Sequence, residues 1–89
     1  MSLDQSKIFL YHSLGSAYLE KGMFKEAIQA FKDALRVSPD EPNSYYNLGV
    51  AYWKGGRIKE AISAYRKVLK LSPNYPGVAE SLRILEGKY

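Results

Sequence analysis

The chain has no cysteine and only one histidine, and both shortages narrow its chemistry. Without cysteine it forms neither a disulfide framework nor a thiolate metal site. The single histidine, His12, has no carboxylate at metal-ligand spacing and lies in no HExxH-like pattern. The pair Gly55 and Gly56 lacks the strand-to-helix context of a phosphate-binding loop. We therefore expect no metal, no cofactor and no enzymatic activity.

Long hydrophobic runs are also missing. No apolar stretch approaches the roughly 18 residues that a membrane-spanning helix needs. The N-terminus lacks a basic segment followed by an apolar one, so no signal peptide is predicted. The formal net charge of +4 is modest and bears on solubility more than on any one partner. We expect a cytoplasmic protein without a membrane span.

What the chain does contain is an internal repeat. The sequence Lys-Glu-Ala-Ile begins at Lys25 and again at Lys59, an offset of 34 residues. The same offset pairs Tyr11 with Tyr45, Leu14 with Leu48, Gly15 with Gly49, Tyr18 with Tyr52, and Pro39 with Pro73. Composition does not force such a register, so the chain is interpreted as two tandem units.

Each unit is predicted to be a pair of short helices. Apolar residues recur at helical spacing on both sides of Gly22 and of Gly56, which mark turns. In the second unit the spacing predicts helices over about residues 42–54 and 58–71, and the first unit should end its second helix before Pro39. Asp40 and Asn74 are the expected N-caps of the helices that follow them. Helices this short need packing against neighbours to be stable.

Two glycines indicate how the helices pack. Gly15 and Gly49 lie in the middle of predicted helices, where glycine costs about 1 kcal/mol relative to alanine. We expect them to allow a close approach of the second helix of each pair, with Ala27 and Ala61 supplying the facing small surfaces. A helix pair of this kind buries its apolar face only by stacking on a neighbour.

These positions resemble the tetratricopeptide repeat, whose pattern has an aromatic, Leu-Gly, Tyr, Ala, an aromatic, a small residue and Pro at set offsets. The first unit carries Tyr11, Leu14, Gly15, Tyr18, Ala27, Phe31, Ala34 and Pro39. The second unit carries Tyr45, Leu48, Gly49, Tyr52, Ala61, Tyr65, Val68 and Pro73. The resemblance implies an all-α fold, an α-solenoid of two helix–turn–helix repeats plus a C-terminal capping helix. It divides a single domain over 1–89 into repeat one (about 8–41), repeat two (about 42–75) and the capping helix (about 76–86).

The two ends of the array differ. In the last segment Arg83 and Glu86 replace the Gly and Tyr that would receive a further helix, so we interpret it as a solvating end helix. A truncated longer array is the alternative. Near the N-terminus, Leu10, Leu14 and Ala17 share a face where a preceding helix would dock. We expect that face to be covered by another chain, as in a homo-oligomer, or to remain an exposed apolar patch.

A candidate binding surface lies on the first helix of the second unit. Tyr46, Val50 and Trp53 form a second apolar stripe beside the one that faces the core. In stacked pairs of this kind the first helices line the inside of a curve, so we predict a groove for an extended peptide or an amphipathic helix. Its predicted lining is Phe9, His12, Ser16, Leu19, Asn43, Tyr46, Asn47, Val50 and Trp53. The alternative is that Tyr46 and Trp53 pack on the end helix or on Leu19.

One subset of the family grips the C-terminal carboxylate of chaperones. The positions that do so in the family fall here on His12, Ser16, Asn47, Gly77 and Ser81, and only Asn47 keeps the family's residue type. No carboxylate clamp is therefore predicted. Asn47 remains a candidate for hydrogen bonding to a ligand backbone, with a solvated side chain as the alternative.

Basic residues crowd the second half, where Arg66, Lys67 and Lys70 lie in the last turns of a helix and suit its dipole. A nucleic-acid reader interleaves aromatics with its basic face, whereas the spare aromatics here are assigned to the groove. The sequence thus favours a non-enzymatic protein–protein interaction module, a scaffold or adaptor with a protein or peptide ligand. Self-association through the terminal edges, and a basic surface for acidic partners or nucleic acid, are the alternatives.

Overall fold

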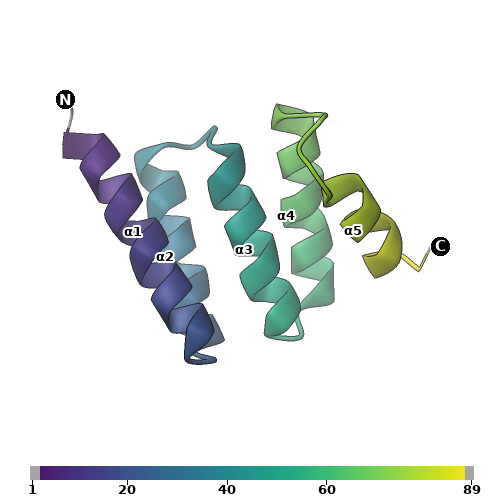
Figure 1. The fold of residues 1–89 in the computed structure, drawn as a ribbon, viewed down its shortest axis with the longest axis horizontal. Coiled ribbons are helices and arrows are strands. Elements are labelled where there is room, and N and C mark those ends of the chain that lie inside the picture. Colours follow the sequence, from purple (N-terminus) through teal and green to yellow (C-terminus); the bar gives the residue numbers. More distant parts are fainter. Residues whose placement is uncertain (1–2, 88–89) are drawn as a thin grey trace.

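The computed structural model describes residues 3–87, with side chains from residue 6 onward. The ends of the predicted domain, residues 1–2 and 88–89, lie outside the described residues. Within the described part the chain forms helices and no strands (Figure 1). The helices are α1 (Leu3–Glu20), α2 (Phe24–Val37), α3 (Pro42–Lys54), α4 (Ile58–Leu71) and α5 (Val78–Leu85). The all-α prediction is confirmed, and the second repeat's helices begin and end where the spacing predicted.

The helices stack as hairpins. α1 packs on α2 and α3 on α4, while α2 also contacts α3 and so joins the two pairs (Figure 1). The short α5 packs on α4 and closes the far end. The elements follow one another along the longest dimension of the molecule, which measures 43 Å. This arrangement is the predicted α-solenoid of two helix pairs and a terminal helix.

The turns inside the two helix pairs have the same backbone conformation. Gly22 and Gly56 adopt the left-handed conformation, with φ of 74° and 82°. In the first turn the amide of Met23 donates to the carbonyl of Tyr18 at 2.9 Å, and in the second the amide of Arg57 donates to the carbonyl of Tyr52 at 2.8 Å. These bonds form the Schellman motif, which requires a positive φ that glycine adopts without strain. The two predicted glycine turns are confirmed.

The mid-helix glycines do permit a close approach, but their partner differs from the prediction. The three atoms nearest to a Cβ added at Gly49 all belong to the Tyr65 ring, the closest at 2.7 Å. A Cβ added at Gly15 would overlap the Phe31 ring in the same way. The aromatic ring of the second helix, rather than Ala27 or Ala61, therefore fills the space above each glycine. The helix register within each pair sets this contact, and the 34-residue period carries no information about that register.

The predicted N-caps are wrong. The N-cap of α3 is Glu41 and that of α5 is Gly77, and neither makes a side-chain capping bond. After α4 the chain instead makes two successive turns, in which the amide of Tyr75 donates to the carbonyl of Ser72 and that of Val78 to the carbonyl of Tyr75. These turns delay the start of α5 to Val78 and hold Tyr75 over α3.

Candidate functional site

The second apolar stripe of α3 opens onto a pocket whose opposite wall is the end helix. Tyr46, Val50 and Trp53 line it together with Tyr65 of α4 and Ile84 of α5. The pocket has a volume of about 430 Å³. Trp53 is 49% exposed and Ile84 is 56% exposed, so both remain accessible from outside. The structure thus brings three of the predicted groove residues together and adds α5 as a wall, whereas the predicted groove lining included no residue of the end helix.

One residue of the pocket lining, Tyr46, also contacts another part of the chain. The ring of Tyr75, from the α4–α5 connection, stacks on Tyr46 with centroids 5.4 Å apart and planes inclined by 27°. The Tyr75 hydroxyl donates a 2.6 Å hydrogen bond to Asn43 Oδ1. Two predicted ligand contacts, Asn43 and Tyr46, therefore already hold an internal partner. The alternative named the end helix or Leu19 as the packing partner of Tyr46, but the stacked ring belongs to the connection before α5, and Trp53 remains 49% exposed.

The sequence prediction missed Tyr75. Its counterpart in the first repeat, 34 residues earlier, is Glu41, so no periodic aromatic marked the position. The one available indication was a large aromatic beside Pro76 in a connection where the first repeat has a charged residue. Residue Tyr65, also in this pocket, was recognised only as a core aromatic.

Two tyrosines at the pocket, Tyr65 and Tyr75, have raised pKa values and keep their protons at neutral pH. Burial, and secondly the neighbouring Tyr46 hydroxyl, raise the pKa of Tyr65 to about 12. Burial likewise raises the pKa of Tyr75, reinforced by Tyr46 and Glu41. The pocket therefore offers neutral hydroxyls and apolar ring faces, which suit an apolar ligand group better than a charged one.

In the first repeat, His12 serves as a link between helices. His12 Nε2 and Ser44 Oγ share a hydrogen bond of 2.6 Å. The His12 ring lies edge-on to the Phe31 ring, with the ring centroids 6.1 Å apart. Burial lowers the pKa of His12, and Glu41 opposes that shift. Because Ser44 is fully buried, its hydroxyl is closed to a substrate. The pair ties α1 to α3 and offers no nucleophile.

The other predicted groove residues lie outside the pocket. Phe9 and Ser16 are exposed on α1, Leu19 is half-buried against the core, and Asn47 is half-buried on α3. None of these four lines the 430 Å³ hollow. The described pocket is thus shorter than the predicted groove and belongs to the second repeat and α5.

Two negative findings apply to the described part of the chain. Among the side chains of residues 6–87, no group of three or more His, Asp or Glu is arranged to hold a metal ion. No described helix is long and apolar enough to cross a membrane.

Comparison with known proteins agrees with this architecture. The family model of the tetratricopeptide repeat matches residues 12–76. Among 71 matching chains of known structure is the first TPR of Spaghetti (RPAP3) bound to the HSP90 peptide SRMEEVD, with a TM-score of 0.57 and 19% identity over 92% of each chain. At that identity the likeness shows a shared fold. No curated protein sequence matches significantly. Because the family match covers more than half of the chain, from residue 12 to residue 76, the chain belongs to the tetratricopeptide repeat family.

Proposed function

We propose that this protein-interaction module binds an apolar segment of a partner protein in the pocket between α3 and α5. The observation that carries the proposal is Trp53, a large aromatic left 49% exposed at the edge of a hollow of about 430 Å³. Tryptophan is among the side chains that most often dominate interface energies. Ile84 faces the same hollow from α5, so an inserted side chain would contact apolar groups on both walls.

The size and chemistry of the hollow favour one anchoring side chain rather than a long apolar stripe. Tyr46 already stacks on Tyr75, which leaves Val50, Trp53 and Ile84 as the apolar lining for an anchor. Burying a Leu, Ile or Phe side chain there would contribute about 1.5–3 kcal/mol. An amphipathic helix or an extended segment with a single large aliphatic or aromatic residue fits this description.

Recognition of a C-terminal carboxylate is not part of the proposal. His12 is occupied by its hydrogen bond to Ser44, and Gly77 has no side chain to offer. Among the family's clamp positions Asn47 alone retains the matching residue type. It is half-buried beside the pocket stripe, where it remains a candidate for bonding to a ligand backbone.

The single tryptophan allows a direct test. Peptides selected from a random library against the wild-type chain should shift the emission of Trp53, because their anchor would bury its indole. Trp53→Ala should weaken their binding at least about tenfold, as expected for a hot spot. Met23→Ala is the matched control, since it truncates another exposed apolar residue, in the α1–α2 turn. Undiminished binding by Trp53→Ala, with circular dichroism showing intact helices, would refute the proposed pocket.

A second candidate function is self-association through α1. Its outer face exposes Leu10 and Leu14, which in the second repeat correspond to buried positions. A second copy covering this face would remove apolar surface from water. Light scattering at high protein concentration tests it, and a strictly monomeric mass would argue against this function.

A further inference from the structure

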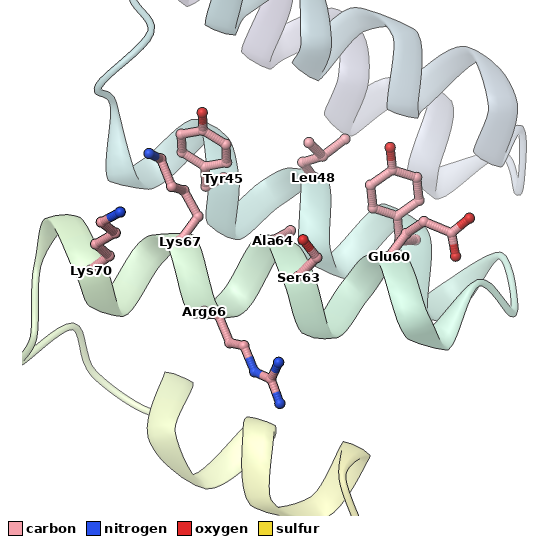
Figure 2. Close-up of a pocket in the computed structure, with 9 residues that line it drawn as sticks. Tyr45, Leu48, Glu60, Ser63, Ala64, Arg66, Lys67 and Lys70 are labelled. Atoms are coloured by element: carbon pink, nitrogen blue, oxygen red, sulfur yellow. The ribbon is translucent and has the colours of Figure 1, made fainter.

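A second hollow lies on a different face of the molecule, between α3 and α4 (Figure 2). It has a volume of about 410 Å³. From α3 it is lined by Tyr45, Leu48 and Tyr52, the stripe beside the one that carries Trp53, and from α4 by Ala64, Lys67 and Lys70. Trp53 and the helix α5 contribute nothing to it. It is therefore independent of the pocket proposed above.

Most charges around this hollow are already neutralised. The guanidinium of Arg57 lies 5.1 Å from the centre of the Tyr52 ring and forms an ion pair with Glu60 at 2.9 Å. Arg66 points away from the other lining side chains, toward α5 (Figure 2), where it pairs with Glu86. These two pairs leave the arginines with little charge to offer a ligand.

At the end of the hollow near Tyr45, the basic side chains are not neutralised by ion pairs with described residues. Lys67 Nζ lies 5.8 Å from the centre of the Tyr45 ring, and Lys70 is on the same side of α4, one turn further along (Figure 2). Among the described side chains, those of residues 6–87, no carboxylate lies at ion-pair distance from either ammonium group. Two uncompensated cations thus stand beside an aromatic ring and an apolar floor.

The ring geometry decides between two classes of acidic partner. Single-stranded nucleic acid needs free aromatic faces on which bases stack. Tyr52 is only 7% exposed and has Arg57 and Lys32 over its ring, while Lys67 lies over Tyr45. Tyr52 is thus closed to a base and Lys67 lies over Tyr45, so the hollow offers no pair of free ring faces for stacking, whereas both ammonium groups are without an ion-pair partner in the described part of the chain. The hollow therefore suits a peptide better than a nucleic acid.

We infer that the α3–α4 hollow is a second docking site, which takes an acidic segment of a partner protein. Side-chain carboxylates of that segment pair with Lys67 and Lys70, and an adjacent apolar residue rests on Leu48 and Ala64. The chain would then hold a partner on two faces, by an apolar anchor at Trp53 and by charge at Lys67. Because the two lysines are at the protein surface, the charge contribution is screened by salt.

The test uses a fluorescein-labelled peptide of alternating glutamate and leucine, with a lysine–leucine peptide as its charge-reversed counterpart. Fluorescence anisotropy at low salt should show binding of the acidic peptide only, weakening as salt rises. Lys67→Glu with Lys70→Glu should reduce its affinity at least about tenfold, because like charges would then oppose it. Lys67→Gln with Lys70→Gln, which removes charge without adding repulsion, should weaken binding to a smaller extent.

The matched control reverses two other exposed lysines, Lys21→Glu with Lys25→Glu, and produces the same change in net charge at the α1–α2 turn. Amide chemical-shift mapping should place the peptide at Leu48, Ala64 and Lys67 and leave Trp53 emission unchanged. Any of four results would overturn the site: no binding by the wild-type chain, equal loss in the control, shifts centred on Val50 and Trp53, or displacement by a single-stranded oligonucleotide. None of these outcomes would refute the Trp53 pocket, and shifts centred on Val50 and Trp53 would place this peptide in that pocket instead.

Discussion

Leu14 and Leu48 occupy matching positions in the two repeats, yet Leu14 is 42% exposed and Leu48 is 6% exposed. The same contrast holds for Ala17, which is exposed, and Ala51, which is fully buried. The difference arises because α3 is covered by α2 on one side and α4 on the other, whereas α1 is packed only from the α2 side and touches α3 slightly. Identical residues thus have different energetic roles according to their place in the stack.

The contacts inside each pair, in contrast, are the same in both repeats. Gly15 lies under Phe31 as Gly49 lies under Tyr65, and both glycines are buried. Contacts within a hairpin depend on the repeat sequence alone, while contacts between hairpins need a neighbour. The period therefore encodes the hairpin, and the number of units determines how much of its surface is buried.

The largest expected effect on stability distinguishes Leu48 from Leu14, which occupy matching positions in the two repeats. Leu48→Ala should lower the free energy of unfolding by about 2–5 kcal/mol, because it leaves a cavity between α2, α3 and α4. Leu14→Ala, its matched control, should cost clearly less, because Leu14 already has much of its surface in water. Urea denaturation followed by circular dichroism measures both. Equal losses would show that α1 is covered in solution, by a second copy or by rearrangement.

The helix layout was largely predictable from the sequence. Apolar spacing predicted α3 and α4 correctly, because their period-3.6 patterns are bounded by Pro42, Gly55 and Ser72. The N-caps were not predictable in this way, since Asp40 and Asn74 are typical capping residues that the chain uses in turns instead. After α4, where Asn74 lies in a turn and does not cap a helix, Tyr75 packs on Tyr46. This contact between distant residues cannot be predicted from the local sequence pattern.

The candidate site was predictable only in part. The second stripe on α3, formed by Tyr46, Val50 and Trp53, lines a hollow because residues three and four apart share a helix face, and its use as a binding surface stays a prediction. The wall that α5 forms could not be predicted from the sequence, since the angle at which α5 crosses α4 depends on long-range contacts. His12 illustrates the same limit: its position predicted a ligand contact, and its bond to Ser44 depends on how closely α1 approaches α3.

An intermediate effect concerns the His12–Ser44 link, which the second repeat lacks because Tyr46 stands at the position equivalent to His12. Ser44→Ala should lower the free energy of unfolding by about 1 kcal/mol at neutral pH, the net value of one hydrogen bond. Burial lowers the folded-state pKa of His12 below its ordinary 6.5. As the pH falls, the unfolded chain therefore takes up a proton on His12 before the folded chain does. The stabilisation of the folded state by the His12–Ser44 link is complete above about pH 6.5 and declines below it.

His12→Gln serves as the control for that pH dependence, because it removes the titrating group while carboxylates titrate as before. Subtracting its unfolding free energy from that of the wild type, measured by urea denaturation from pH 8 to about pH 5, should give a difference that shrinks as the pH falls. A constant difference, or one that grows toward acid, would contradict the burial of a neutral His12. The expected pH sensitivity is confined to the first repeat, which sharpens its contrast with the second.

The smallest expected effect on stability comes from making the edge of the first repeat resemble the interior of the second. Leu10 is 61% exposed, and its counterpart Ser44 is fully buried. Leu10→Ser should change the unfolding free energy of the monomer by no more than about 0.5 kcal/mol, as for other exposed sites. If the wild-type chain associates through α1, the same substitution should lower the mass measured by light scattering toward that of a monomer, whereas Ile58→Ser, at an exposed apolar site in the second repeat, should not. An associated mass that persists in Leu10→Ser would assign the interface to another face, and the exposed leucines of α1 would then be an unpartnered edge of the stack.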